Sequence, residues 1–411
     1  MKRKIIQFIT DEKFLDSTID LMSLCSEEYD IIYYNISETQ TSFKFIVRNQ
    51  HLVHTITIYE AENILRNLHD STVVIHSISA LPLELYDSLA QDNVLVWNTW
   101  GFDIYSDFFV KENLIRKWHL RHLSCLGSYY VLPPIVPISL YHTATTKILD
   151  KKPFLQKTKH AIHDWVYYRL FKSDYEKAQS NFEHLINRID YISTVLPLEY
   201  EKLNTCGFVK AKYVKWAYVG TSNPVLPSEM EIQSRGRDIL VGNSADANNN
   251  HIDVFLKLQQ VGVSDRKVVV PLSYPLFGLY RDMVLQEGNK LLGSSFCPIK
   301  DFMPFQYYNE LIGKCSYAVF FNERQHAIGN ISLALMSGLK VFLSETSMAY
   351  QHFKNLGLKL YSVQKDLNKG ELGSPLSMDD IMHNQSILMR NKGLEEKKKM
   401  CLTYLSMVSN K

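Results

Sequence analysis

The sequence predicts an α/β protein with parallel, doubly wound sheets, and three observations indicate this class. Short apolar runs of strand length alternate with segments of helical periodicity along most of the chain. The stretch from Asp238 to Pro275 shows the order strand, loop, helix, strand, which is the βαβ unit of parallel sheets. The chain has 411 residues, a length that suggests two domains rather than one.

The βαβ unit begins with the apolar run Ile239–Val241, continues through a helix predicted over His251–Gln260, and closes with the run Lys267–Leu272. The loop after its first strand should lie at the carboxyl edge of the sheet, where ligands bind. Gly242 lacks a Cβ, so its backbone can approach a ligand closely. Asn248–Asn250 are candidate N-caps of a helix start that suits an anion such as a phosphate. The same turn is equally compatible with helix capping alone.

The other elements follow in the same alternation. In the N-terminal part we expect strands at 5–9, 30–35, 42–47, 72–76, 94–97 and 190–195, and helices at 14–24, 61–68, 83–89 and 182–189. In the C-terminal part we expect helices at 278–287, 304–315, 331–337 and 347–356, and strands at 290–292, 317–321 and 340–343. The predicted domains are 1–205, 206–365 and a helical tail at 366–411.

Composition excludes several classes of function. The formal net charge of +2 is too small to indicate nucleic-acid binding. The six cysteines form no CxxC pair, so neither a zinc site nor a disulfide framework is predicted, as suits a reducing cytoplasm. No apolar run has the length of a membrane span. Basic and aromatic residues mix at 113–123 and 147–172, which predicts contact with an anionic membrane surface or, alternatively, a solvated basic face over an aromatic core.

Two strand ends in the N-terminal part carry candidate residues for binding a second substrate. His76 ends one apolar strand, and the segment Trp97–Tyr105 follows another. This segment concentrates Trp97, Trp100, Gly101 and Asp103, and aromatic walls with one carboxylate are typical of a sugar-binding cleft. The alternatives are a capped strand-end histidine and, for Asp103, the N-cap of the next helix.

Three loops of the C-terminal part follow strands and precede helices, at 242–250, 322–330 and 344–347. They should therefore converge on one edge of one sheet. An arginine beside helix N-termini suits a diphosphate, and a carboxylate such as Glu345 suits sugar hydroxyls. Ser273 and Tyr274 are candidates for a base pocket. The full set of residues predicted to bind this diphosphate-containing ligand is Gly242, Asn243, Ser244, Asn249, His251, Ser273, Tyr274, Arg324, Gln325, Gly329, Asn330 and Glu345.

The absence of several known motifs narrows the range of reactions expected at this sheet edge. The sequence has no Walker-type GxxxxGK[ST] and no GxGxxG after the first strand, which disfavours ATP hydrolysis and dinucleotide oxidoreduction. It has no DxD and no clustered His and Asp residues, so we expect no metal and no cofactor.

The segments GNSADANNNHIDVF, VVVPLSYP and FFNERQHAIGNISLALMSGLKVFLSE, together with WNTWGFDIY, resemble glycosyltransferase family 56. Members of that family are bacterial TDP-N-acetylfucosamine:lipid II N-acetylfucosaminyltransferases of enterobacterial common antigen synthesis. The resemblance covers patches of about 70–360. It implies a GT-B fold, in which two Rossmann-like domains face a central cleft and the C-terminal one binds the nucleotide sugar. It also implies a polyprenyl-diphosphate-linked acceptor and a peripheral location at the cytoplasmic face of the inner membrane.

The resulting hypothesis is a hexosyltransferase that moves a deoxyamino sugar, similar to 4-acetamido-4,6-dideoxygalactose, from a dTDP-sugar to a lipid-linked saccharide. Arg324, Gln325 and the helix start at Gly329–Asn330 would neutralise the departing diphosphate. Asp103 would act as general base if the reaction inverts, with His76 as second choice. The alternatives are another nucleotide sugar, a protein acceptor, or a non-catalytic sugar-nucleotide-binding subunit of a glycan assembly.

Overall fold

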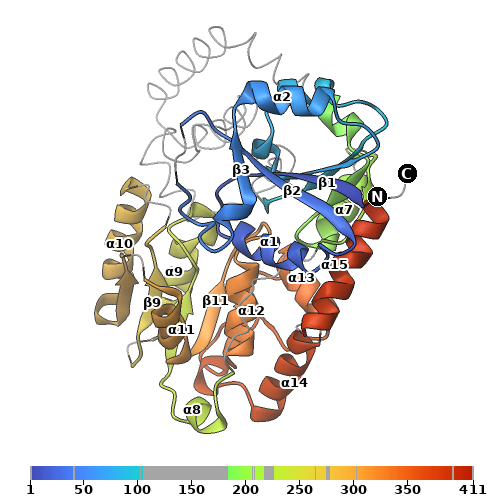
Figure 1. The fold of residues 1–411 in the computed structure, drawn as a ribbon. Coiled ribbons are helices and arrows are strands. Elements are labelled where there is room, and N and C mark those ends of the chain that lie inside the picture. The colour runs from blue at the N-terminus through green and yellow to red at the C-terminus, as the bar shows by residue number, and fades with distance from the viewer. Residues whose placement is uncertain are drawn as a thin grey trace, which may run out of the picture. The chain divides into compact units, whose positions relative to one another are not determined.

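The computed structural model describes residues 2–39, 42–101, 103–104, 184–205, 207, 209–216, 226–263, 265–274, 278–301, 303–390 and 393–409. These residues form two compact units (Figure 1). The first unit contains the described residues up to 216 and those from 393 to 409, and the second contains those from 226 to 390. The predicted basic and aromatic segments 113–123 and 147–172 lie outside the described residues.

The first unit is a parallel sheet with strand order β3-β2-β1-β4-β5-β6-β7. Every described pairing in it is parallel, as the alternation of strands and helices predicts. Its strands are β1 (Arg3–Ile9), β2 (Tyr29–Ile36), β3 (Val53–Ile56), β4 (Thr72–His76), β5 (Val94–Asn98), β6 (Tyr191–Ser193) and β7 (Lys212–Tyr213). Its helices are α1 (Leu15–Ser23), η1 (Gln50–Leu52), α2 (Ile58–Arg66), η2 (Ile78–Ala80), η3 (Leu83–Ser88), α7 (Pro197–Thr205) and α15 (Leu394–Ser409).

The second unit is a parallel sheet with strand order β10-β9-β8-β11-β12-β13. Its strands are β8 (Asp238–Val241), β9 (Val268–Pro271), β10 (Phe296–Ile299), β11 (Cys315–Phe320), β12 (Lys340–Leu343) and β13 (Tyr361–Ser362). Its helices are α8 (Glu229–Gln233), η6 (Ala247–Asn249), α9 (His251–Val261), α10 (Gly278–Leu292), η7 (Gly293–Ser295), α11 (Phe305–Gly313), α12 (Ile328–Met336), α13 (Met348–Asn355), η8 (Glu371–Gly373) and α14 (Met378–Met389).

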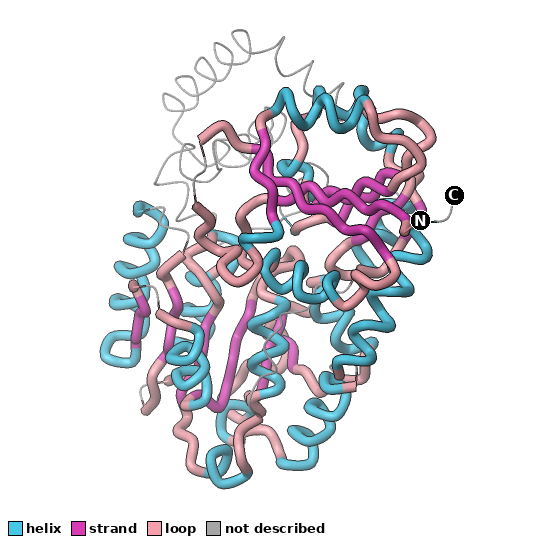
Figure 2. Tube along the Cα trace, viewed as in Figure 1, coloured by secondary structure: helices cyan, strands magenta, loops and turns pink. Residues whose placement is uncertain are grey.

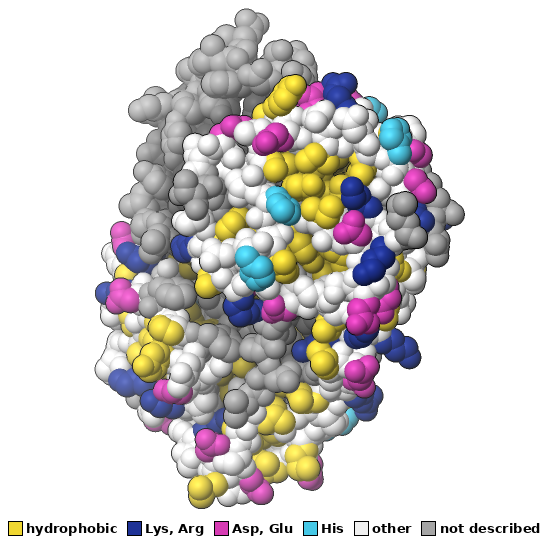
Figure 3. Space-filling view, in the orientation of Figure 1, with side chains coloured by type: hydrophobic (Ala, Val, Ile, Leu, Met, Phe, Trp, Pro, Cys, Tyr) yellow, Lys and Arg dark blue, Asp and Glu magenta, His cyan; other side chains and the backbone are white. Residues whose placement is uncertain are grey.

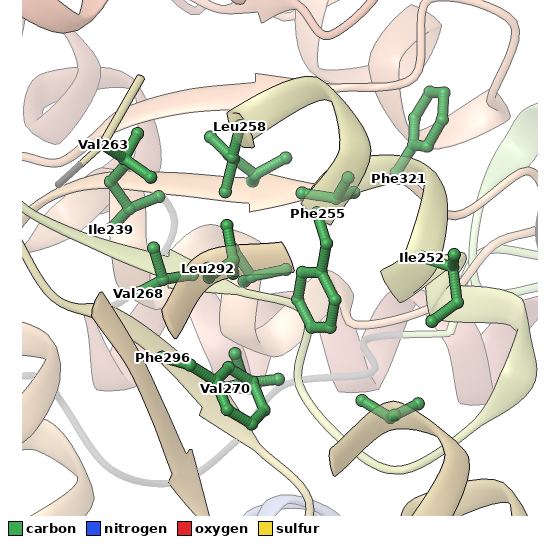
Figure 4. Packing of buried hydrophobic residues seen from close by; sticks show 14 of the residues in the cluster. Ile239, Ile252, Phe255, Leu258, Val263, Val268, Val270, Leu292, Phe296 and Phe321 are labelled. Atoms are coloured by element: carbon green, nitrogen blue, oxygen red, sulfur yellow. The ribbon is translucent and has the colours of Figure 1, made fainter. Parts of the chain in front are cut away.

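Helices cover both faces of the second sheet (Figure 2) because alternate strand residues point to opposite sides. Ile239 and Val241 of β8 join the cluster formed with α9 and α10, whereas Leu240 joins the cluster formed with α11, α12 and α13. Figure 4 shows the first of these clusters, where Phe255 of α9 packs edge-on against Phe296 with ring centroids 5.6 Å apart. These two cores hold the strand ends, and therefore the loops after them, in fixed register.

The chain returns to the first unit at its C-terminal end. Tyr404 and Leu405 of α15 are buried in the same cluster as Ile5 of β1 and Leu15 of α1. The hydroxyl of Tyr404 donates to Oδ1 of Asn98 at 3.0 Å, and Oγ1 of Thr72 donates to the carbonyl of Val408 at 3.0 Å. The predicted tail 366–411 is thus divided between the two units.

Two predicted elements and one predicted domain boundary differ from the structure. The segment 42–47 is not a strand, because the carboxylates of Asp11 and Asp16 accept the backbone N–H groups of residues 44–49 that a strand would use for pairing. Residues 290–292 continue α10, and the strand of that region is β10. The first domain extends past residue 205, because β7 pairs with β6.

Acidic and basic side chains are interspersed on the face seen in Figure 3, in keeping with the nearly balanced composition. Within the described ranges, no helix is long and apolar enough to cross a membrane.

Candidate functional site

The strand order of the second sheet locates the candidate site. β8 and β11 are neighbours, and the connections leaving them run to opposite sides of the sheet, towards β9 and β12 respectively. A doubly wound sheet opens a crevice at such a switch point, outside the carboxyl ends of the two strands. The loops that flank it here are 242–250, after β8, and 321–327, after β11.

Gly242 begins the first of these loops, and its position is strained for any residue with a Cβ. Its φ is +68°, in the region that disfavours side chains, and its N–H donates to the carbonyl of Val319 at 2.9 Å. A Cβ placed there would lie 3.0 Å from Oδ1 of Asn249 and 3.0 Å from Nε2 of His251. Gly242 therefore lets the chain pass closely over two polar side chains of its own loop.

Asparagine side chains join the two loops instead of capping α9. The Asn249 carboxamide donates to the carbonyls of Ser244 and Asp246, both at 3.1 Å, and accepts from the N–H of Asn243 at 3.3 Å. Asn250 donates to the carbonyl of Phe321, at the end of β11, at 2.8 Å. The sequence predicted these asparagines as N-caps, but α9 has no side-chain cap.

Two helices start at the crevice with no side-chain hydrogen bond at the N-cap. The N-cap residues are Asn250 for α9 and Ala327 for α12, and both are left-handed, with φ of 50° and 60°. By contrast, Ser347 caps the neighbouring helix α13 through its hydroxyl. The first N–H groups of α9 and α12 thus lack the usual side-chain acceptor and suit an anionic ligand.

Arg324 brings positive charge to this place. Its Nη2 lies 3.3 Å from Oδ2 of Asp246, so an ion pair joins the loop after β11 to the loop after β8. Burial raises the pKa of Asp246, but the charges of Arg324 and His326 and the hydrogen bonds from Asn248 together outweigh it, and the pKa falls to about 2. The sequence analysis did not select Asp246. The one local feature that could have indicated it is its role as a cap: Asp246 caps η6 by accepting from the N–H of Asn248 at 2.8 Å.

Two histidines lie at the same edge. His251 is fully buried; its Nδ1 is 2.8 Å from the Tyr280 hydroxyl, and its Nε2 has no hydrogen-bond partner among the described residues. Burial lowers the pKa of His251 to about 3. His326 bonds to Asn322 at 3.0 Å through Nδ1, and burial, together with the charge of Arg324, lowers the pKa of His326 to about 4. Both imidazoles are therefore neutral near pH 7.

The third predicted loop, 344–347, is tied to the loop after β11 by Glu323. Its carboxylate accepts from the hydroxyls of Ser344 at 2.7 Å and Thr346 at 2.6 Å. Glu345, predicted to hold sugar hydroxyls, instead pairs with Lys365 at 2.8 Å and accepts from Ser362 at 3.2 Å. The prediction that the three loops meet is confirmed, whereas the Glu345 carboxylate is already engaged.

The remaining predicted donor-side residues lie around these loops. Gln325 is buried in the loop after β11, and Gly329 is exposed in the first turn of α12. Asn330 faces α11, where its Oδ1 accepts from the hydroxyl of Tyr308 at 2.9 Å. Ser273 and Tyr274 follow β9, and the ring of Tyr274 is 57% exposed. The carbonyl of Tyr274 accepts from the N–H of Ala245, so the loop after β9 is tied to the loop after β8.

On the first unit, Asp103 ties two strand-end loops together. Its carboxylate accepts from the Ser77 hydroxyl at 2.8 Å, the Trp100 N–H at 2.8 Å and the Ile78 N–H at 3.4 Å. The residue is 2% exposed, and this burial raises the pKa of Asp103 to about 7. The pKa suits a general base at neutral pH, but the burial and the three donors give Asp103 a structural role in this conformation.

The other predicted acceptor-side residues divide into core and surface. His76 is 1% exposed with Nε2 at 2.7 Å from Oε1 of Gln7, and Trp97 is 1% exposed within β5. Both pack inside the sheet, where an acceptor does not reach them, because each strand is covered on its two faces. Trp100 is partly exposed and stacks on Phe14, with centroids 5.4 Å apart and planes at 28°. Gly101 follows it. Phe14, 53% exposed, was missed by the sequence analysis.

Among the described residues, no group of three or more His, Cys, Asp or Glu side chains is placed to hold a metal ion. The expected independence from metal stays a prediction.

Comparison with known proteins points to one family. Residues 215–403 match the model of the family described as 4-alpha-L-fucosyltransferase glycosyl transferase group 56. This segment, 189 of the 411 residues, is similar to the glycosyltransferases of that family. The matched segment contains all of the second sheet and both loops of the crevice.

Solved structures show that this glycosyltransferase has the GT-B fold. A glycosyltransferase from Rickettsia africae ESF-5 is 11% identical, with a TM-score of 0.60 and 100% of both chains covered. A structure described as trehalose-6-phosphate from E. coli bound with UDP-2-fluoro glucose is 8% identical, with a TM-score of 0.58, covering 100% of this chain and 99% of that one. Anabaena Alr3699/HepE in complex with UDP is 10% identical, with a TM-score of 0.55, covering 99% and 100%.

Replacing Gly242 with Ala should disturb the crevice of the glycosyltransferase. The added Cβ would meet Asn249 and His251 at 3.0 Å in a strained backbone conformation, so we expect a lower thermal-unfolding midpoint and weaker nucleotide binding. Gly262→Ala, at the end of α9, is the matched control, because Gly262 also has a positive φ, of +83°, but a Cβ there meets nothing within 4 Å. Equal behaviour of the two variants would show that the close approach at Gly242 is unimportant.

The raised pKa of Asp103 predicts a pH-dependent stability. Between its ordinary value of 3.8 and about 7, the folded state keeps the proton that the unfolded state has lost, so stability falls as pH rises through this window. Asp103→Asn should remove that fall, and the gap in unfolding midpoint between variant and wild type should change by several degrees between pH 5 and pH 7.5. Asp70→Asn, at a side chain 91% exposed, should leave the pH dependence unchanged. A pH-independent gap for Asp103→Asn would contradict the burial of this carboxylate.

Proposed function

We propose that the glycosyltransferase moves a deoxyamino sugar, similar to 4-acetamido-4,6-dideoxygalactose, from a dTDP-sugar donor to a polyprenyl-diphosphate-linked saccharide. The reaction belongs to bacterial surface polysaccharide synthesis of the enterobacterial common antigen type. It needs no metal ion, because an arginine and two helix starts supply the positive potential that a diphosphate requires.

The observation that carries this proposal is the pairing of Arg324 with Asp246 across the crevice, beside the open starts of α9 and α12. Donor phosphates would take over the guanidinium face and the first N–H groups of both helices. Phosphate binding at the carboxyl edge of a doubly wound sheet is the arrangement expected of nucleotide sites in this class of sheet.

The sugar is proposed from the family description, which names a fucosyltransferase. Fucose is a 6-deoxyhexose of the galacto series, and so is a 4-acetamido-4,6-dideoxygalactose. The UDP named in two structural neighbours makes UDP the first alternative nucleotide to test.

On the acceptor side we propose that the exposed ring of Phe14, stacked on Trp100, supports a sugar ring of the acceptor. The acceptor hydroxyl oxygen attacks the anomeric carbon, and the bond from that carbon to the diphosphate oxygen breaks. The diphosphate leaves with the electron pair. In an inverting reaction, Asp103 takes the hydroxyl proton once the turn that buries it has opened.

A lipid-linked acceptor would confine the reaction to a membrane surface. We therefore propose a peripheral location at the cytoplasmic face of the inner membrane. The mixture of basic and aromatic residues at 113–123 and 147–172 supports contact with anionic lipid.

Thermal-shift titration without metal tests the donor. A ligand that binds only the folded state raises its stability with the logarithm of concentration over Kd. We expect dTDP to stabilise the protein more than UDP, GDP, CMP or ADP. Arg324→Ala should abolish this shift and reduce transfer by orders of magnitude while leaving the fold intact. Arg237→Ala, which removes a guanidinium 61% exposed on the same unit, is the matched control.

Selective stabilisation by UDP would retain glycosyl transfer and reject the dTDP donor. Binding of dTDP without any transfer to lipid-linked acceptors would favour a non-catalytic binding subunit. An unchanged shift in Arg324→Ala would remove the diphosphate assignment.

A further inference from the structure

His326 lies in the loop between β11 and α12, directly before the N-cap residue Ala327. We propose that His326 is a further ligand of the donor diphosphate, which it meets as a neutral imidazole donating from Nε2, and that Asn322 is the positioning residue that fixes this tautomer. The inference rests on the proposed function, because it names a further contact in the same diphosphate site.

The argument begins at Asn249, whose carboxamide can point only one way. Its Nδ2 donates to the carbonyl oxygens of Ser244 and Asp246, both at 3.1 Å. Carbonyl oxygens accept but never donate, so the amide nitrogen must face them. Oδ1 of Asn249 is therefore an acceptor, and it receives the N–H of Asn243 at 3.3 Å.

Asn322 is oriented in turn by the loop after β8. Its Nδ2 lies 3.2 Å from the carbonyl of Asn248 and 3.4 Å from Oδ1 of Asn249. A flipped Asn322 would place its oxygen against these two acceptors, which is unfavourable. The same Nδ2 lies 3.0 Å from Nδ1 of His326. Nδ2 carries two hydrogens for these three acceptors, and Nδ1 of His326 is the nearest of them, so Nδ1 accepts and the ring proton sits on Nε2.

Burial keeps the His326 ring neutral, and the charges around it act in opposite directions. Arg324, two positions earlier in the same loop, opposes a second positive charge, whereas Asp246 across the crevice favours one. His251 of α9 is itself neutral. Protonated His326 would carry a hydrogen on Nδ1 that faces the Nδ2 donor of Asn322, so the geometry of the network also opposes the cation.

This arrangement gives the diphosphate two kinds of donor. Arg324 supplies charge, and His326 supplies a directed N–H that binds an oxygen without a proton changing hands. Among the described residues, Nε2 of His326 has no hydrogen-bond partner, and the residue is partly exposed. Donor binding should consequently be insensitive to pH where an unperturbed histidine would titrate.

The tautomer is measured in the unliganded protein by long-range nitrogen–proton NMR of the imidazole rings. We expect His326 to show a protonated Nε2 and a bare Nδ1 from pH 6 to pH 8. The opposite tautomer, or a cation in this range, would overturn the inference whatever the donor nucleotide is.

Asn322→Asp supplies the second test, because a carboxylate accepts instead of donating. His326 should then carry a proton on Nδ1, and its pKa should rise towards the ordinary range. With dTDP as probe, variant and wild type are compared at each pH, because the terminal phosphate of dTDP itself titrates near pH 6. The ratio of the Kd of Asn322→Asp to that of wild type should fall several-fold between pH 8 and pH 6. A flat ratio in a folded Asn322→Asp protein would contradict the positioning role.

Contact with the diphosphate is tested by His326→Ala and His326→Gln. Loss of a hydrogen bond to a charged group predicts a Kd for dTDP roughly tenfold higher in the alanine variant. The glutamine variant retains an N–H donor and should recover part of that loss. Equal affinity in wild type and His326→Ala would overturn the contact. Failure of wild type to bind dTDP while it binds UDP would count against the proposed donor only, and the same variants would then be compared with UDP.

Discussion

The structure depends on one constraint of parallel sheets. A chain that leaves the carboxyl end of a strand must return to the amino edge before it can pair again in parallel, so every loop that follows a strand lies at the same edge. All described pairings in both sheets are parallel. Residues as distant in sequence as Asp246 and Arg324 are thereby brought within 3.3 Å. The functional chemistry of the chain can gather only there.

The two units use this edge differently. In the first, the carboxylates of Asp11, Asp16 and Asp103 take up loop N–H groups that an anion would otherwise bind. In the second, carboxamides link the loops and the starts of α9 and α12 carry no side-chain cap. The same strand order thus yields one edge already supplied with negative charge and one suited to a diphosphate. This difference favours an anionic ligand at the edge of the second unit over one at the edge of the first.

The backbone at the crevice is also strained. Asn250 and Ala327 hold left-handed backbones, which cost of order 1–3 kcal/mol each for residues other than glycine. The Asn250 carboxamide, which bonds to the carbonyl of Phe321 at 2.8 Å, and the ion pair of Arg324 help to hold these turns. Strained helix starts held by polar links persist when the surrounding structure over-determines them, which is common at ligand sites.

The sequence predicted the fold well because its signals are local. β12 has the predicted bounds, the run 239–241 lies within β8, and the run 267–272 contains β9. It failed at 42–47, where β-prone residues lose their pairing groups to the distant Asp11 and Asp16. It selected Arg324 by charge and loop position but missed Asp246, whose ion-pair partner Arg324 is brought near by strand order. It also missed His326, whose partner Asn322 lies in the same loop. Trp97 begins a segment whose composition is typical of a sugar site, yet Trp97 lies in β5, which is buried on both faces.

Hydrogen–deuterium exchange with and without dTDP, read peptide by peptide, tests the central claim that the donor diphosphate binds at the β8–β11 crevice. The account predicts protection of the loop 242–250 with the start of α9, and of the loop 321–327 with the start of α12. It predicts no dTDP-dependent protection at 10–14, 77–80 or 99–101 of the first unit. Protection confined to the first unit, with exchange at both crevice loops unchanged by dTDP, would contradict it.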